Sequence, residues 1–163
     1  MQRRGHRFIK WIILAVVMAL VALAVVNHKW IYDFWRGFSY DPSAEVAEIR
    51  DRLDLADYGA FLFNASQPAL SNRDEFNEKC RGERDEEDAI LGCYTDEDIY
   101  VYNIVDEKLD GIRECTTAHE LLHAVWRRMD QNEQEKFRSS LSQVYEQNKS
   151  LLAEELDIYE ENE

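Results

Sequence analysis

The sequence predicts an α+β domain that follows a single N-terminal membrane helix. A long apolar run lies near the N-terminus, which is typical of a membrane segment. Further along, one stretch alternates aromatic and β-branched residues, as strands do. Helical spacing of apolar residues, three and four apart, occurs on both sides of that stretch. We therefore expect a small β-hairpin or sheet packed on helices.

Length and charge limit the classes of function. The chain has 163 residues and a formal net charge of −14, enough for one domain with a modest core. Its first residues are nevertheless basic, at Arg3, Arg4, Arg7 and Lys10, and no acidic residue precedes Asp33. The remaining body is strongly acidic, so it is a poor partner for nucleic-acid phosphates and for anionic lipid heads. We expect no nucleic-acid partner, and membrane contact only through the N-terminal helix.

The apolar run is the predicted membrane anchor. Trp11 to Val26 contains only apolar residues, and we assign 11–27 to a transmembrane segment behind a cytoplasmic tail of residues 1–10. Basic residues before the run predict a cytoplasmic N-terminus and a body on the other side of the membrane. The alternative is a cleaved signal peptide, because Ala22-Leu23-Ala24 offers small residues for a cleavage site. Both interpretations place the body outside the cytoplasmic membrane.

The rest of the chain divides into two parts. Residues 28–41 form an aromatic juxtamembrane segment, which we expect either in the membrane interface or packed on the domain. Residues 42–163 form the extracytoplasmic domain. Its first helix is expected after the capping residue Ser43, and the apolar run Tyr58–Asn64 is expected as a buried strand. A loop then leads to a short helix capped by Ser71 or Asn72.

The second half of the domain is expected to contain a hairpin and two helices. Ile90–Tyr94 and Ile99–Val105 are separated by the polar turn Thr95–Asp98, which indicates two antiparallel strands. A helix is expected over Ile112–Asp130, where no Pro or Gly interrupts the spacing, and a last one over about Asn132–Tyr159.

Three cysteines fall in the body. An oxidising compartment permits one disulfide among them. Cys80 and Cys93 bracket a polar acidic loop that a disulfide would close, and the alternative is that all three thiols are free. Cys115 precedes His119 by one helical turn, and we expect it to be a buried thiol.

The most informative motif is His119-Glu120-Leu121-Leu122-His123, which reads H-E-x-x-H. Residues four apart share a helix face, so His119 and His123 can offer two imidazole nitrogens to one tetrahedral Zn2+ ion. Glu120 is the candidate general base, which takes a proton from the attacking water. One alternative is an ordinary amphipathic helix on which the two histidines are simply polar residues. A second, for Glu120 alone, is that Thr117 and Glu120 form a capping box at a later helix start.

From Cys93 to His123 the sequence resembles the gluzincin-like zinc metallopeptidases of the zincin fold, in particular small bacterial ones that are membrane-anchored or exported. The resemblance rests on Gly92-Cys93-Tyr94, Asp98–Tyr102 and Thr117–Ala124, about a fifth of the chain. It implies a zincin-like fold, zinc as cofactor and peptide or protein substrates. It also implies that Ile99–Val105 is an edge strand that can pair with an extended peptide.

The resemblance further implies a third zinc ligand, a glutamate from a later helix. The longer motif with a third histidine is absent, because Met129 stands where that motif has its third histidine. The candidate glutamates are Glu146, Glu154, Glu155 and Glu160. By pattern the chain ends in mid-helix at Glu163, so the third ligand can also be expected beyond it, and a site of two histidines would bind zinc weakly. The alternative function is a non-catalytic exported interaction domain with structural zinc or none.

Overall fold

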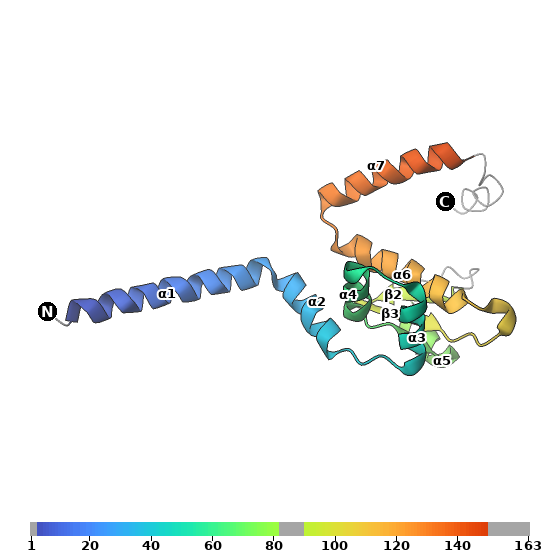
Figure 1. The fold of residues 1–163 in the computed structure, drawn as a ribbon, viewed down its shortest axis with the longest axis horizontal. Helices are drawn as coiled ribbons and strands as arrows, with labels where there is room; N and C mark the ends of the chain where they lie inside the picture. The colour runs from blue at the N-terminus through green and yellow to red at the C-terminus, as the bar shows by residue number, and fades with distance from the viewer. Residues whose placement is uncertain (1–2, 82–89, 150–163) are drawn as a thin grey trace. The chain divides into compact units, whose positions relative to one another are not determined.

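The computed structural model describes residues 3–81 and 90–149, and the side chains from residue 9 onward (Figure 1). Helices and one small three-stranded sheet make this an α+β protein, which confirms the predicted class. The chain forms two compact units, residues 1–124 and 125–163, which are described separately.

Two consecutive helices begin the chain. α1 spans Arg3–Val26, and α2 spans His28–Ser39, with only Asn27 between them. Ile9–Val26 within α1 is long and apolar enough to cross a membrane, and none of this stretch is buried within the protein. A signal sequence near an N-terminus has the same properties. The juxtamembrane segment is thus a helix over most of its length.

The sheet contains the predicted hairpin and one strand that was not predicted. β2 (Gly92–Thr95) pairs antiparallel with β3 (Asp98–Tyr102), across a tight turn in which Asp96 and Glu97 have φ values of 50° and 71°. β1 (Ala69–Ser71) pairs parallel with the other side of β3. The expected edge position of the second hairpin strand is therefore wrong, since β3 is central and β1 and β2 flank it. A strand of three residues is too short for a periodic pattern to reveal it.

The register assigns the side chains of β2 and β3 to two faces. Cys93 and Tyr100 are paired across the two strands, so their side chains share one face of the sheet. This face is turned toward α5 (Arg73–Lys79), because Cys93 forms a disulfide with Cys80 at the C-terminal end of that helix. Gly92 and Val101 are paired on the opposite face, and Gly92 lies against side chains of α6 (Ile112–Arg128). The sheet is therefore layered between α5 and α6.

Two further helices lie between α2 and the first strand. α3 (Ala44–Leu53) is capped by Ser43, whose hydroxyl accepts a hydrogen bond from the Val46 amide, as predicted. α4 (Asp57–Ala65) replaces the buried strand expected over Tyr58–Asn64. That expectation was wrong because a short continuous apolar run has no periodicity to separate a buried helix from a buried strand. Leu62, Phe63 and Ala65 of α4 are core residues.

The remaining helices agree with the expectation at their starts. The short 3-10 turn η1 (Glu107–Leu109) precedes α6. α6 begins at Ile112 as predicted and ends two residues before the predicted end. In the second unit, α7 (Gln131–Asn148) begins with a capping box between Asp130 and Glu133. The predicted continuation of this last helix to Tyr159 falls on residues 150–159, outside the described residues.

Candidate metal site

The H-E-x-x-H motif lies in the middle of α6, and its side chains are divided between a buried and an exposed side of the helix. The sheet-facing side is buried and consists of Glu114, Thr117, Glu120, Leu121 and Ala124. His119, Leu122 and His123 are exposed on the other side. The capping-box alternative is wrong, because Thr117 is inside the helix and its hydroxyl donates to the Arg113 carbonyl at 2.7 Å.

Cys115 belongs to the exposed side of α6. Its thiol is free and exposed, so the expectation of a buried thiol is wrong. The error followed from the sequence pattern, which correctly grouped Cys115 with His119 but took their shared face as the core-facing one. The predicted disulfide between the other two cysteines is confirmed, since Cys80 and Cys93 are bonded, with Cα atoms 5.8 Å apart.

The two histidines have the spacing that a shared metal ion requires. Their Nε2 atoms are 3.2 Å apart, and their ring centroids are 5.0 Å apart. Two imidazole nitrogens bound to one tetrahedral zinc, each at 2.0–2.1 Å, are separated by about 3.3 Å. The same distance suits a hydrogen bond between two neutral rings. Both imidazoles are exposed on the helix surface, so an ion can reach them from solvent.

Glu120 lies between the histidines in sequence but points toward the sheet. It is only 6% exposed, and its side chain lies directly over Gly92 at the start of β2. A Cβ atom on Gly92 would come within 2.5 Å of Thr116 Cγ2, 2.9 Å of Glu120 Cγ and 3.0 Å of Glu120 Oε1. Glycine at this position therefore makes room for the carboxylate. The proximity of Gly92 to this carboxylate was not predicted, because no local pattern reports a contact 28 residues away.

The start of α6 is fixed by an arginine from α3. Arg52 makes two hydrogen bonds to the Asp110 carboxylate, at 3.0 and 3.2 Å, and an ion pair with buried Glu114 at 2.9 Å. The hydrogen bonds from Arg52 lower the pKa of Asp110, and those to Asp110 raise the pKa of Arg52. Arg113 adds a hydrogen bond to Asn103, at 3.3 Å, in the loop after β3.

No third metal ligand is found in the part of the chain that the structure describes. Among residues 3–81 and 90–149, no group of three or more His, Cys, Asp or Glu residues is arranged to hold a metal ion. Glu146 is within these residues, on α7. The other three candidates, Glu154, Glu155 and Glu160, lie outside them. The histidine pair thus fits a zinc ion as two of its ligands, and the remaining protein ligand stays unassigned.

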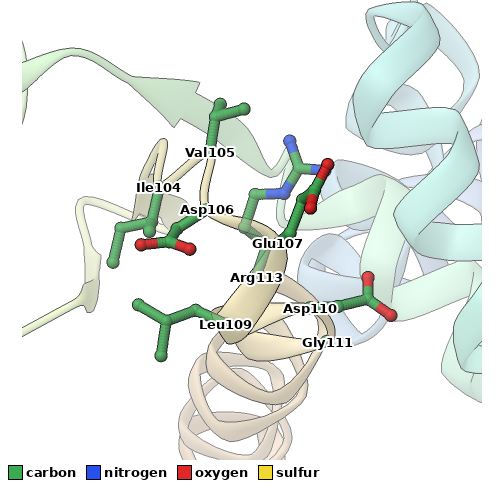
Figure 2. A pocket seen from close by; sticks show the side chains of 8 residues that line it. All are labelled: Ile104, Val105, Asp106, Glu107, Leu109, Asp110, Gly111 and Arg113. Atoms are coloured by element: carbon green, nitrogen blue, oxygen red, sulfur yellow. The ribbon is translucent and has the colours of Figure 1, made fainter.

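A cavity of about 400 Å³ lies at the N-terminal end of the same helix. Its walls come from the loop between β3 and α6 and from the first turn of α6, and its lining includes Asp106, Glu107, Asp110 and Arg113 (Figure 2). The motif residues do not line it. Since His119 follows Gly111 by eight residues, the two places are about 12 Å apart along the helix axis. The cavity is therefore separate from the candidate metal site.

Comparison with known protein families, with curated proteins and with solved structures finds no match to this chain.

Proposed function

We propose that the protein is a membrane-anchored zinc metallopeptidase that hydrolyses peptide bonds outside the cytoplasmic membrane. The 3.2 Å separation of the His119 and His123 Nε2 atoms, on an exposed helix face, is the observation that carries this proposal. It matches the spacing expected for two ligands of one tetrahedral zinc ion. The motif resemblance adds a fold of the zincin type and peptide or protein substrates.

The proposed chemistry assigns one role to each motif residue. His119 and His123 hold the ion, which when bound supplies a Lewis acid that lowers the pKa of a water molecule. Glu120 accepts the proton of the attacking water and delivers it to the leaving amine.

The proposed location rests on three features. α1 has the length and composition of a membrane span. The basic residues before it favour a single-pass arrangement with a cytoplasmic N-terminus. The Cys80–Cys93 disulfide favours an oxidising compartment for the body. Cleavage of the N-terminal segment as a signal peptide is the alternative, and it leaves the body on the same side.

Two measurements on the full chain in detergent test the metal site. We expect about one zinc ion per chain after dialysis, and none in the double variant H119A/H123A. The matched control is H28A, because His28 is also exposed but lies on α2. A wild-type chain that holds no stoichiometric zinc, even after zinc is added, would rule out the metallopeptidase.

The role of Glu120 has a test of its own. E120Q should keep its zinc and lose at least about 100-fold in kcat/KM on a labelled unfolded protein such as casein. The control is E114Q, which removes another buried carboxylate of the same helix. Equal losses in both variants would indicate a structural effect, and full activity in E120Q would exclude Glu120 as the base.

The second candidate is a non-catalytic exported domain that binds a partner protein. It is favoured by the absence of a third ligand among residues 3–81 and 90–149, since two histidines alone would bind zinc too weakly to support catalysis. Zinc held by four protein ligands, with no hydrolysis of any peptide, would select this candidate.

A further inference from the structure

The inference concerns the exposed face of α2. Four exposed aromatic side chains on this helix contact one another: Trp30, Phe34, Trp35 and Phe38 are 60%, 44%, 62% and 75% exposed. They form one continuous group, which we call the aromatic patch. Phe34 stacks on both Trp30 and Phe38, with ring centroids 5.6 and 6.2 Å apart, and Trp35 meets Phe38 edge to face at 6.2 Å. A contiguous group of exposed apolar side chains is typical of a contact site.

The opposite face of α2 is occupied by the folded body. Arg36 donates from Nε to the Ala65 carbonyl at the end of α4, at 2.8 Å, and forms an ion pair with Asp98 at the start of β3. Gln67 donates to the Arg36 carbonyl at 3.1 Å, and Asp33 is buried. The aromatic patch therefore cannot turn inward without breaking this docking, so its partner must come from outside the described body.

The chain itself indicates which partner this is. α2 follows the candidate membrane span after one residue, and backbone hydrogen bonds continue across the junction, from Asn27 to Leu23 and from Ile31 to Asn27, each 3.0 Å. Trp30 is thus within about 6 Å of Val26 along the helix axis, comparable with the thickness of the interfacial layer on one side of a bilayer. Trp and other aromatic residues are the side chains that this layer prefers.

We propose that the chain bends at Asn27, which separates α1 from α2 with φ −101° and ψ 17°, so that α2 lies in the plane of the membrane. The aromatic patch is then inserted among the lipid head groups and upper acyl chains. Amphipathic helices with bulky aromatic residues on one face bind membranes in this way. The body is then seated directly on the bilayer through Arg36 and does not hang from α1 on a tether. This inference rests on α1 being a retained anchor, as proposed above, and is independent of zinc and of catalysis.

Tryptophan fluorescence of the full chain in phosphatidylcholine vesicles tests the arrangement. We choose this zwitterionic lipid because the acidic body is repelled by anionic head groups. Three single-tryptophan chains retain Trp11, Trp30 or Trp35, and phenylalanine replaces the others. Lipids brominated near the head group should quench Trp30 and Trp35 alike, more strongly than lipids brominated deep in the acyl chain, and both should emit at shorter wavelengths than indole in water.

Each other result would overturn the proposal, and the Trp11 chain separates the possible causes. If Trp11 is quenched and neither Trp30 nor Trp35 is, then α1 is inserted but α2 stays in water. Quenching of Trp30 without Trp35 means that only the start of α2 touches the interface and the helix leaves the membrane. Short-wavelength emission from Trp35 without quenching means that protein, such as a second copy of the chain, covers the patch.

A surface variant completes the test. F34S/F38S should reduce the quenching of Trp35, because the patch loses most of its apolar area on that side. The matched control is L141S/V144S, which removes two exposed apolar side chains from α7. Equal quenching in the F34S/F38S chain and the control would show that the patch does not hold α2 in the membrane.

Discussion

Gly92 is the residue on which the contact between α6 and the sheet depends. An added Cβ would overlap Thr116 and Glu120 at distances that real Cβ atoms almost never show. The close approach buries the candidate base Glu120, whereas His119 and His123 on the same helix are exposed. A single methyl group at this position would push against the helix that carries the motif.

We expect G92A to destabilise the protein by about 1–3 kcal/mol, the usual range for overpacking a filled core. Thr116 Cγ2 is the nearest obstacle, so T116S should restore part of the loss in the double variant. The measurement is urea denaturation of the full chain in detergent.

The control for this prediction is G59A, in α4. There an added Cβ would meet only Leu55 atoms at 3.4 Å or more, and the change should stabilise the helix by up to about 1 kcal/mol. A G92A chain as stable as wild type would mean that α6 and β2 are not packed as described.

At this scale the sequence reveals the motif but not its surroundings. The spacing of His119 and His123 predicts their shared face, because helix geometry is local. Which face looks toward the core depends on the sheet that α6 meets, and Cys115 was therefore assigned to the wrong environment. Gly92 carries no local signal at all, since its partners are 24 and 28 residues away.

Among the elements, α5 and β2 are joined by a covalent bond. The Cys80–Cys93 disulfide lies in a buried cluster with Phe76, beside the half-buried rings of Tyr100 and Tyr102. It closes a loop with a sequence separation of 13. It therefore fixes the sheet face opposite α6.

We expect the double variant C80A/C93A to lose about 3 kcal/mol of unfolding free energy, the range for a disulfide that closes a loop of this length. The loss should be visible as a lower urea midpoint under oxidising conditions, and a reducing agent should lower the wild-type midpoint in the same direction. C115A, which removes the exposed thiol, should change the midpoint little. Equal midpoints for C80A/C93A and C115A would contradict a stabilising disulfide.

Elements with a clear hydrophobic periodicity or a recognisable turn could be predicted from the sequence, and short elements without either could not. The seventeen residues of α6, and the hairpin with its polar turn, have local sequence patterns that do not depend on distant contacts. α4 and β1 do not, because a nine-residue apolar helix resembles a buried strand and a three-residue strand resembles a loop. The missed β1 also changed the expected site, since it makes β3 central and removes it as a peptide-pairing edge.

Over the whole molecule, two arginines connect segments that are far apart in sequence. Arg36 connects α2 with the hairpin, and Arg52 connects α3 with the start of α6. Each neutralises carboxylates in a chain whose net charge is −14, where unpaired acids repel one another. The partners lie 58 to 62 residues away along the chain, and no sequence pattern distinguishes them from the other acidic residues.

We expect R52Q to lower the urea midpoint, because buried Glu114 loses its cationic partner. The control is R50Q, which removes a weaker contact of 3.7 Å to the neighbouring, exposed Asp51, and its effect should be smaller. A midpoint for R52Q equal to that for R50Q would contradict the role assigned to Arg52.

The pH dependence gives this prediction a sign. Hydrogen bonds from Arg52 lower the pKa of Asp110 in the folded protein, so this pair contributes stability above the ordinary aspartate pKa of about 3.9. That contribution disappears as the pH falls through the lower folded value. The difference in urea midpoint between wild type and R52Q should therefore be full at neutral pH and shrink below about pH 4.

The disulfide also has a consequence for timing, if the body is exported as proposed. A chain still in the cytoplasm keeps Cys80 and Cys93 as thiols, because that compartment is reducing. The bond between α5 and β2 can then form only after both segments have crossed the membrane. The body would reach its full stability only at its destination, so a chain waiting for translocation remains easier to unfold and to thread through the membrane.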